Sequence, residues 1–178
     1  MSYPARIYIV PTDWWYIERT VWLIAGVVLL SGTILALFVN PYWILLVTAT
    51  GLVSTNVALT GFCPLSTALL RLGWRAALAT PTSNDRGIYV MQTDSWYLER
   101  RIYVTVGVNI TIGSILVLMH SIWWSAFTGF VGLAMVWFAS TGFCILANVL
   151  YWIGAEPRLN PASFAGHPAA LKTRPTAP

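Results

Sequence analysis

The chain has 178 residues, of which 57% are hydrophobic and only 9% are charged, and its mean hydropathy is +0.69. Soluble domains carry about 25% charged residues, so this composition excludes an ordinary soluble domain and indicates an integral membrane protein. The formal net charge of +4 comes without a basic run, and we therefore expect no nucleic-acid partner. The basic residues are expected to contact anionic lipid head groups instead.

Uncharged apolar runs of spanning length predict the crossings. A helix needs about 20 predominantly apolar residues to cross a bilayer, whereas transmembrane β-strands have about ten residues of alternating polarity. The sequence therefore predicts an all-α integral membrane protein with four transmembrane helices. These lie at about residues 20–38, 42–62, 101–119 and 122–143.

The two halves of the chain align without gaps at a shift of 81 residues, which carries Cys63 onto Cys144. Residues 7–19, IYIVPTDWWYIER, match residues 88–100, IYVMQTDSWYLER. Each half consists of a lead-in, a helical hairpin and a short tail, and it enters and leaves on the same face. We therefore expect two parallel tandem-repeat hairpins related by a pseudo-two-fold axis along the membrane normal.

This alignment divides the chain into four parts. The first repeat covers residues 1–75, a cytoplasmic linker 76–87, the second repeat 88–154 and a Pro- and Ala-rich cytoplasmic tail 155–178. The tail has little means of building a core. We expect it to dock on a partner.

Charge placement predicts the orientation. All Lys, Arg, Asp and Glu residues lie on the side of the termini and the linker, and the hairpin tips at 38–43 and 119–124 carry no formal charge. Basic residues that flank crossings stay in the cytoplasm. We therefore expect a multi-pass protein of the bacterial inner membrane with both termini in the cytoplasm.

Each lead-in ends in an acidic residue followed by aromatic residues. Asp13 and Asp94 are expected to cap the free first-turn amides of the helices that follow them. Aromatic rings favour the head-group level, so we interpret these residues as interfacial anchors. The cytoplasmic belt comprises Trp14, Trp15, Tyr16, Trp22, Trp96, Tyr97 and Tyr103, and the outer belt comprises Trp43, Trp123 and Trp124.

Asn56 and Asn109 are the most polar side chains well inside the crossings. Helix rise places both about 10 Å below the cytoplasmic boundary. We hypothesise a hydrogen bond between them, worth about 0.6 kcal/mol. Contact with a partner helix or a lipid carbonyl is the alternative.

The tetrapeptide motif TGFC occurs twice, and its two copies contain both cysteines of the chain. Cys63 and Cys144 are expected near helix C-termini at the cytoplasmic boundary, where glycines permit close helix packing. The proline of the first copy should kink or end its helix, whereas isoleucine at that position lets the second helix run straighter. The motif residues are Thr60, Gly61, Phe62, Cys63 and Pro64, with Thr141, Gly142, Phe143 and Cys144 in the second copy.

TGFCP after a two-helix hairpin, with Glu18-Arg19 and Glu99-Arg100 before the first helix of each copy, resembles a family of small bacterial inner-membrane proteins of unknown function. That hairpin is also the membrane domain attached to certain rhodanese sulfurtransferases. The resemblance covers about residues 12–75 and 93–154, and Ile145 departs from the family's proline. It implies a link between the cysteines and sulfur chemistry.

Two readings of the cysteines follow. In the functional one, Cys63 and Cys144 carry persulfide sulfur or gate a thiol-linked substrate between the hairpins. In the other, they are small packing residues at a tight crossing. A helix C-terminus opposes a thiolate, which favours the packing reading.

Other chemistry has little support. His120, at the outer tip, is a weak candidate for a tetrapyrrole metal ligand, and the scattered Cys and His residues cannot form a tetrahedral zinc site. Intramembrane ionisable groups mark ion pathways, and the predicted crossings lack them. We therefore predict no enzyme, no metal and no cofactor, while a bound lipid or pigment stays open.

The favoured function is a non-enzymatic accessory or stabilising subunit of a larger membrane complex, such as a respiratory or photosynthetic assembly. Its partners would be membrane lipids and other integral membrane subunits. The rival is a sulfur- or thiol-handling membrane carrier that uses Cys63 and Cys144.

Overall fold

The computed structural model describes residues 7–80, 83 and 87–159. Most of the predicted tail and part of the predicted linker lie outside these ranges. Within them the chain forms six α-helices, two 3-10 turns and isolated β-bridges. The helices are α1 Ile17–Phe38, α2 Ile44–Thr60, α3 Pro64–Arg71, α5 Leu98–Met119, α6 Ser125–Thr141 and α7 Ile145–Trp152, and the turns are η1 Pro41–Trp43 and η2 Ile122–Trp124.

Four helical segments are long and apolar enough to cross a membrane: Ile17–Phe38, Pro41–Thr60, Leu98–Met119 and Ile122–Thr141. The two segments of 22 residues are about 33 Å long at 1.5 Å per residue, which matches a hydrocarbon core of about 30 Å. The prediction of a helical chain with four segments long and apolar enough to cross a membrane is confirmed. The first and third crossings begin three residues earlier than predicted.

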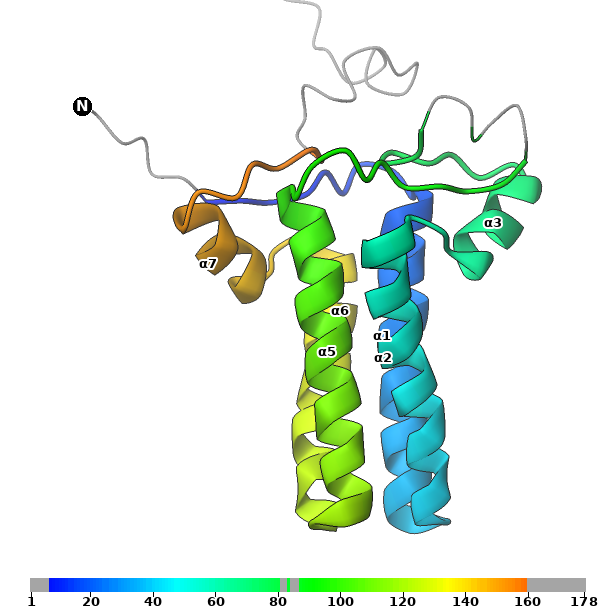
Figure 1. Ribbon diagram of the computed structural model, residues 1–178, viewed down its shortest axis with the longest axis vertical. Coiled ribbons are helices and arrows are strands. Elements are labelled where there is room, and N and C mark those ends of the chain that lie inside the picture. Colours follow the sequence, from blue (N-terminus) through cyan, green and yellow to red (C-terminus); the bar gives the residue numbers. More distant parts are fainter. Residues whose placement is uncertain (1–6, 81–82, 84–86, 160–178) are drawn as a thin grey trace, which may run out of the picture.

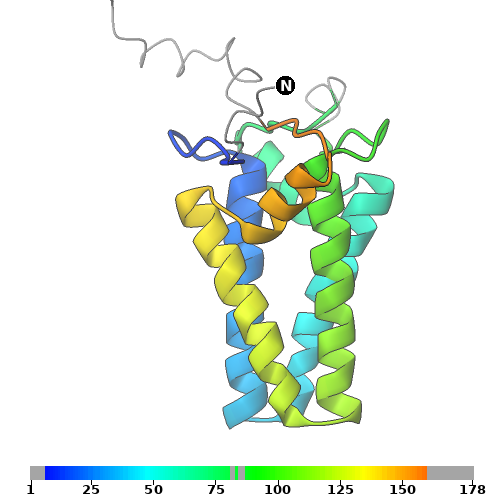
Figure 2. The ribbon, with the colours of Figure 1, turned by 90° about the vertical axis from the view of Figure 1, so that its left-hand side faces the viewer.

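The four long helices pack mainly across the two halves of the chain. α1 lies along α6, and α2 lies along α5, whereas the two helices of each hairpin contact one another less (Figure 2). Glycines permit this: a Cβ on Gly26 would lie 2.9 Å from the Gly132 carbonyl oxygen, and one on Gly107 would lie 2.7 Å from that of Gly51. Small residues let helix backbones approach closely in membranes. Neither hairpin is therefore a self-contained packing unit.

The lead-ins cross to the opposite hairpin. Val10 N–H donates to the Gly142 carbonyl at 3.0 Å, and Met91 N–H donates to the Gly61 carbonyl at 2.8 Å. The short helices α3 and α7 project to opposite sides of the bundle at this same end (Figure 1). A layer of loops and short helices thus joins the two halves at the charged end of the bundle.

Glycine ends both second helices of the hairpins. Gly61 and Gly142 are left-handed C-caps with φ of 77° and 74°, a conformation that other residues rarely adopt. A Cβ on either would also lie 2.5 Å from a lead-in carbonyl, that of Met91 or Val10. The prediction of a straighter second helix is therefore wrong, because both helices end at the glycine whether Pro64 or Ile145 follows.

Helix α1 begins after Tyr16 and α5 after Tyr97, and neither has a side-chain cap. The prediction that Asp13 and Asp94 cap these helices is wrong. Distant carbonyls accept from the first-turn amides instead: Ile17 N–H donates to Arg75 O, and Leu98 N–H donates to Glu156 O, each at 2.9 Å. Such partners satisfy the amides that a cap would otherwise bind.

Several rings expected at the head-group level are core residues. Tyr16, Trp22, Tyr97 and Tyr103 are buried, so their assignment as interfacial anchors is wrong. Trp22 stacks on Phe138 with ring centroids 4.5 Å apart. These rings fill the space between the helices beneath the loop layer.

Candidate functional site

Two buried carboxylates organise the charged end of the bundle. Glu18 lies in the first turn of α1 and accepts hydrogen bonds from the amides of Ala77 and Leu78 at 3.0 and 2.7 Å and from the Tyr89 hydroxyl at 2.9 Å. It is fully buried. Charge-assisted bonds of this kind compensate for the loss of hydration. The loop after α3 is thereby attached to the start of α1.

Glu99 makes the same contacts in α5. It accepts from the amides of Arg158 and Leu159 at 3.1 and 2.8 Å and from the Tyr8 hydroxyl at 2.7 Å. Each partner lies 81 positions from its counterpart around Glu18, with each tyrosine exchanged between the halves. Burial, with the Glu99 carboxylate beside it, raises the pKa of Tyr8, so this phenol remains a donor.

The arginine after each glutamate caps a helix of the other half. Arg19 Nε donates to the Ala139 carbonyl, and Arg100 Nε donates to the Ala58 carbonyl, both at 2.7 Å. These carbonyls belong to the last turns of α6 and α2, where free carbonyls and the helix dipole favour a cation. Each guanidinium also stacks on an exposed tryptophan, Arg19 on Trp15 at 4.1 Å and Arg100 on Trp96 at 4.0 Å.

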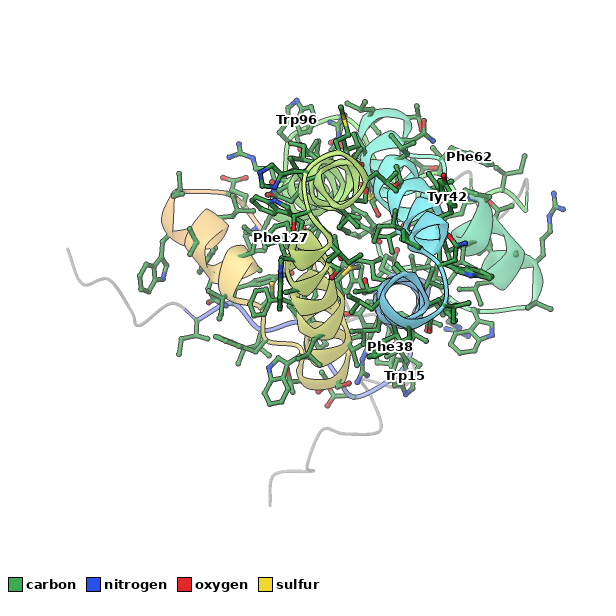
Figure 3. The ribbon with its side chains drawn as sticks, turned by 90° about the horizontal axis from the view of Figure 1, so that it is seen from below. Trp15, Phe38, Tyr42, Phe62, Trp96 and Phe127 are labelled. Carbon is green, nitrogen blue, oxygen red and sulfur yellow. The ribbon has the colours of Figure 1, made fainter. Side chains whose placement is uncertain are left out.

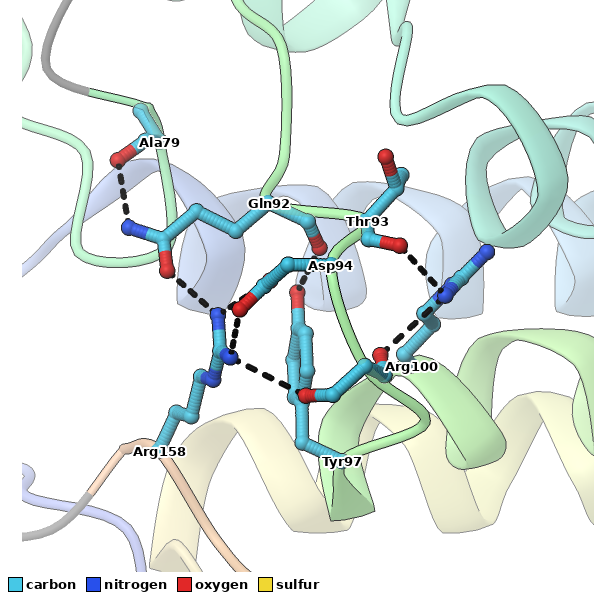
Figure 4. A network of polar contacts seen from close by, with 8 residues as sticks. Ala79, Gln92, Thr93, Asp94, Tyr97, Arg100 and Arg158 are labelled. Atoms are coloured by element: carbon cyan, nitrogen blue, oxygen red, sulfur yellow. Dashed lines mark hydrogen bonds and ion pairs between the residues drawn. The ribbon is translucent and has the colours of Figure 1, made fainter.

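A polar network continues beyond Arg100 (Figure 4). Arg158 pairs with the exposed Asp94 carboxylate at 2.9 Å and also contacts the Gln92 amide oxygen. The guanidinium lowers the pKa of Asp94, and it lies 4.4 Å from the Tyr97 ring. This network fastens the chain after α7 to the lead-in of α5.

The cysteines lie at helix N-termini. Cys63 is the N-cap of α3 and accepts a hydrogen bond from Ser66 N–H at 3.4 Å, and Cys144 is the N-cap of α7. The prediction of C-terminal positions is wrong, because each preceding helix ends three residues earlier, at Thr60 or Thr141. Cys63 is buried at 3% exposure and Cys144 is partly buried, and burial raises the pKa of the Cys144 thiol.

The two intramembrane asparagines do not bond to each other. Asn109 donates to the Thr105 carbonyl one turn back at 2.8 Å, and Asn56 makes no side-chain hydrogen bond within the described ranges. Both side chains are exposed. The predicted internal pair is therefore wrong, and a partner outside the described residues is the alternative that remains.

The other predicted residues lie mainly at the surface. His120 Nδ1 accepts from the Trp124 indole at 3.1 Å, and the described residues contain no group of three His, Cys, Asp or Glu side chains that could hold a metal. Trp14 is half-buried, whereas Trp15, Trp43, Trp96, Trp123 and Trp124 are exposed. Seen from the tips, Trp15 and Trp96 lie at the periphery (Figure 3).

A cavity of about 500 Å³ lies between α5, α6 and α7. Its walls are almost wholly apolar and include Trp22, Phe127, Trp137 and Phe138, with Asn109 as a polar group and Cys144 at the α7 end. Figure 3 shows Phe127 on α6 beside α5. Because Phe130 and Trp137 are 65% and 61% exposed, the cavity opens at the side of the helical bundle.

Sequence reasoning missed the buried glutamates and their tyrosines. Their signal was available, since Tyr8, Glu18 and Arg19 recur as Tyr89, Glu99 and Arg100 in the aligned lead-ins. Identity at aligned positions in both halves indicates a shared contact. The sequence does not show, however, that each tyrosine binds the glutamate of the other half of the chain.

No family model, curated protein or solved structure matches this chain. The resemblance to the hairpin family stays a prediction.

Proposed function

We propose that this protein is a non-enzymatic accessory or stabilising subunit of a larger membrane complex. The observation that carries the proposal is Asn56, an exposed amide within a candidate crossing whose side chain has no partner in the described residues. An unsatisfied amide facing hydrocarbon is unfavourable, and such residues form hydrogen bonds between membrane helices. A helix of another subunit would supply the missing donor and acceptor.

The ionisable residues support a structural rather than a transport function. In the candidate crossings, the described acids and bases lie in the first turns of α1 and α5. The two glutamates and the arginines that follow them bind loop amides, tyrosines and helix-end carbonyls. Ion pathways use ionisable groups deeper in the membrane.

The proposal includes two parallel tandem repeats around a pseudo-two-fold axis along the membrane normal, in a bacterial inner membrane with both termini cytoplasmic. The matching contacts of Glu18 and Glu99 support the repeat. The uncharged tips support the orientation. Alkaline phosphatase fused after Asn40 or Ser121 should be active, and a fluorescent protein on either terminus should fluoresce; a cytosolic tip would refute this topology.

Photo-crosslinking tests the subunit proposal. A photoreactive amino acid at Asn56 should give one discrete protein adduct in native membranes, together with a stoichiometric complex on native gels. The matched control is the same probe at Ala58, which is fully buried on the same helix and should give no intermolecular adduct. A monomeric chain with lipid adducts alone would refute the proposal.

A sulfur- or thiol-handling carrier is the second candidate. The N-cap positions of Cys63 and Cys144 favour it, because a helix N-terminus stabilises a thiolate. Their burial and the opposite directions of α3 and α7 (Figure 1) weigh against a shared path. This candidate requires both thiols to react with a small maleimide from the cytoplasmic side, with loss of function in Cys63→Ser; protected thiols would remove it.

A further inference from the structure

We propose that the cavity between α5, α6 and α7 binds a flat, lipophilic carbonyl compound of the quinone class. Its volume of about 500 Å³ falls within the range of about 300–1,000 Å³ that is typical of small-molecule sites. Such sites combine apolar and aromatic walls with a few polar groups. The sideways opening admits a molecule dissolved in the lipid.

Asn109 is the polar side chain at the cavity that a carbonyl would satisfy. Trp22 is 2% exposed, and its indole N–H interacts with the buried hydroxyl of Tyr103. Asn109 uses one amide hydrogen on Thr105 and keeps a second. An acyl chain leaves this second amide hydrogen unsatisfied, whereas a carbonyl oxygen can accept from it.

The aromatic walls are specific to the second half of the chain. At the aligned positions of the first half, Leu46 corresponds to Phe127, Ala49 to Phe130, Asn56 to Trp137 and Val57 to Phe138. Val28 likewise corresponds to Asn109. Four aromatic rings and one amide that are absent at the aligned positions of the first half therefore line one cavity. Aromatic faces favour stacking with a flat ring over contact with a flexible chain.

Tryptophan quenching tests the site in the full chain. We expect a decyl-substituted benzoquinone to quench the fluorescence saturably in nanodiscs of phosphatidylethanolamine and phosphatidylglycerol. Asn109→Val introduces the residue found at the aligned position of the first half, Val28. This substitution should weaken quinone binding at least tenfold. The control Asn56→Val changes another exposed asparagine, which does not line the cavity, and this variant should bind the quinone as the unsubstituted protein does.

Competition distinguishes a carbonyl compound from any apolar chain. Decylbenzene, which has the ring and chain but no carbonyl, should fail to displace the quinone at equal concentration. Displacement by decylbenzene, non-saturable quenching, or equal affinity of both asparagine variants would overturn the proposal. Should Asn109→Val fail to fold, the competition with the unsubstituted protein still decides.

Discussion

The Tyr8 hydroxyl donates a 2.7 Å hydrogen bond to Oε1 of Glu99, 91 positions further along the chain. Tyr89 makes the corresponding bond to Glu18 at 2.9 Å. Each lead-in is thereby attached to the first turn of a helix in the other half of the chain. The two bonds therefore join the halves of the chain at the charged end of the bundle.

We expect Tyr8→Phe to lower the free energy of unfolding by about 1–3 kcal/mol, because it leaves a buried carboxylate one donor short. Thermal or denaturant unfolding in mild detergent, followed by circular dichroism, measures the change. Tyr42→Phe is the control, since Tyr42 is 72% exposed at a hairpin tip. Equal stability of the two variants would contradict the assigned contact.

Arg100→Lys should also destabilise the protein, by about 1–3 kcal/mol. Arg100 donates to the carbonyls of Ala58, Thr93 and Ser95, and a lysine cannot reproduce this forked geometry. Arg101→Lys is the matched control, because Arg101 donates at the exposed surface to Trp96. The same unfolding assay compares the variants, and an equal effect of both would show that the fork is unimportant.

The crossings could be predicted from the sequence because length and apolar composition determine them locally. The helix starts could not, since the amides of Ile17 and Leu98 bind carbonyls of Arg75 and Glu156 that lie more than 50 residues away. The local sequence around Asp13 does not indicate that a carbonyl so distant in the chain accepts from the first-turn amide of α1.

The positions of the cysteines could have been predicted more closely. Glycine in the left-handed conformation commonly ends helices, and TGFC places Gly61 two residues before Cys63. Because the glycines were interpreted only as packing residues, the predicted crossings continue to residues 62 and 143, past the observed helix ends at Thr60 and Thr141. The cavity is different, because it depends on the spacing of α5 and α6, which one sequence does not determine.

Labelling of Cys144 should depend on pH. Burial raises the pKa of this thiol, so the reactive thiolate is scarce near neutral pH and increases as the pH rises toward that value. In Cys63→Ser, which leaves one thiol, the maleimide rate should be slower than after unfolding in dodecyl sulfate and should rise throughout pH 7.5–9.5. A rate already at its plateau at pH 7.5 would show a lowered pKa and favour the thiol carrier.

Gly107→Ala should separate α2 from α5. The new Cβ would lie 2.7 Å from the Gly51 carbonyl oxygen and 2.7 Å from the Thr55 nitrogen, and backbone atoms cannot move aside as a flexible side chain can. We expect a loss of about 1–3 kcal/mol from overpacking, measured by unfolding in detergent.

Gly129→Ala is the matched control for this helix contact. A Cβ there would meet only Thr33 Cγ2, at 3.5 Å, which is ordinary van der Waals contact. Because alanine favours a helix over glycine by about 1 kcal/mol, Gly129→Ala should leave stability unchanged or raise it. If Gly107→Ala were tolerated equally well, the close approach of α2 and α5 could not be the contact that joins the halves within the membrane.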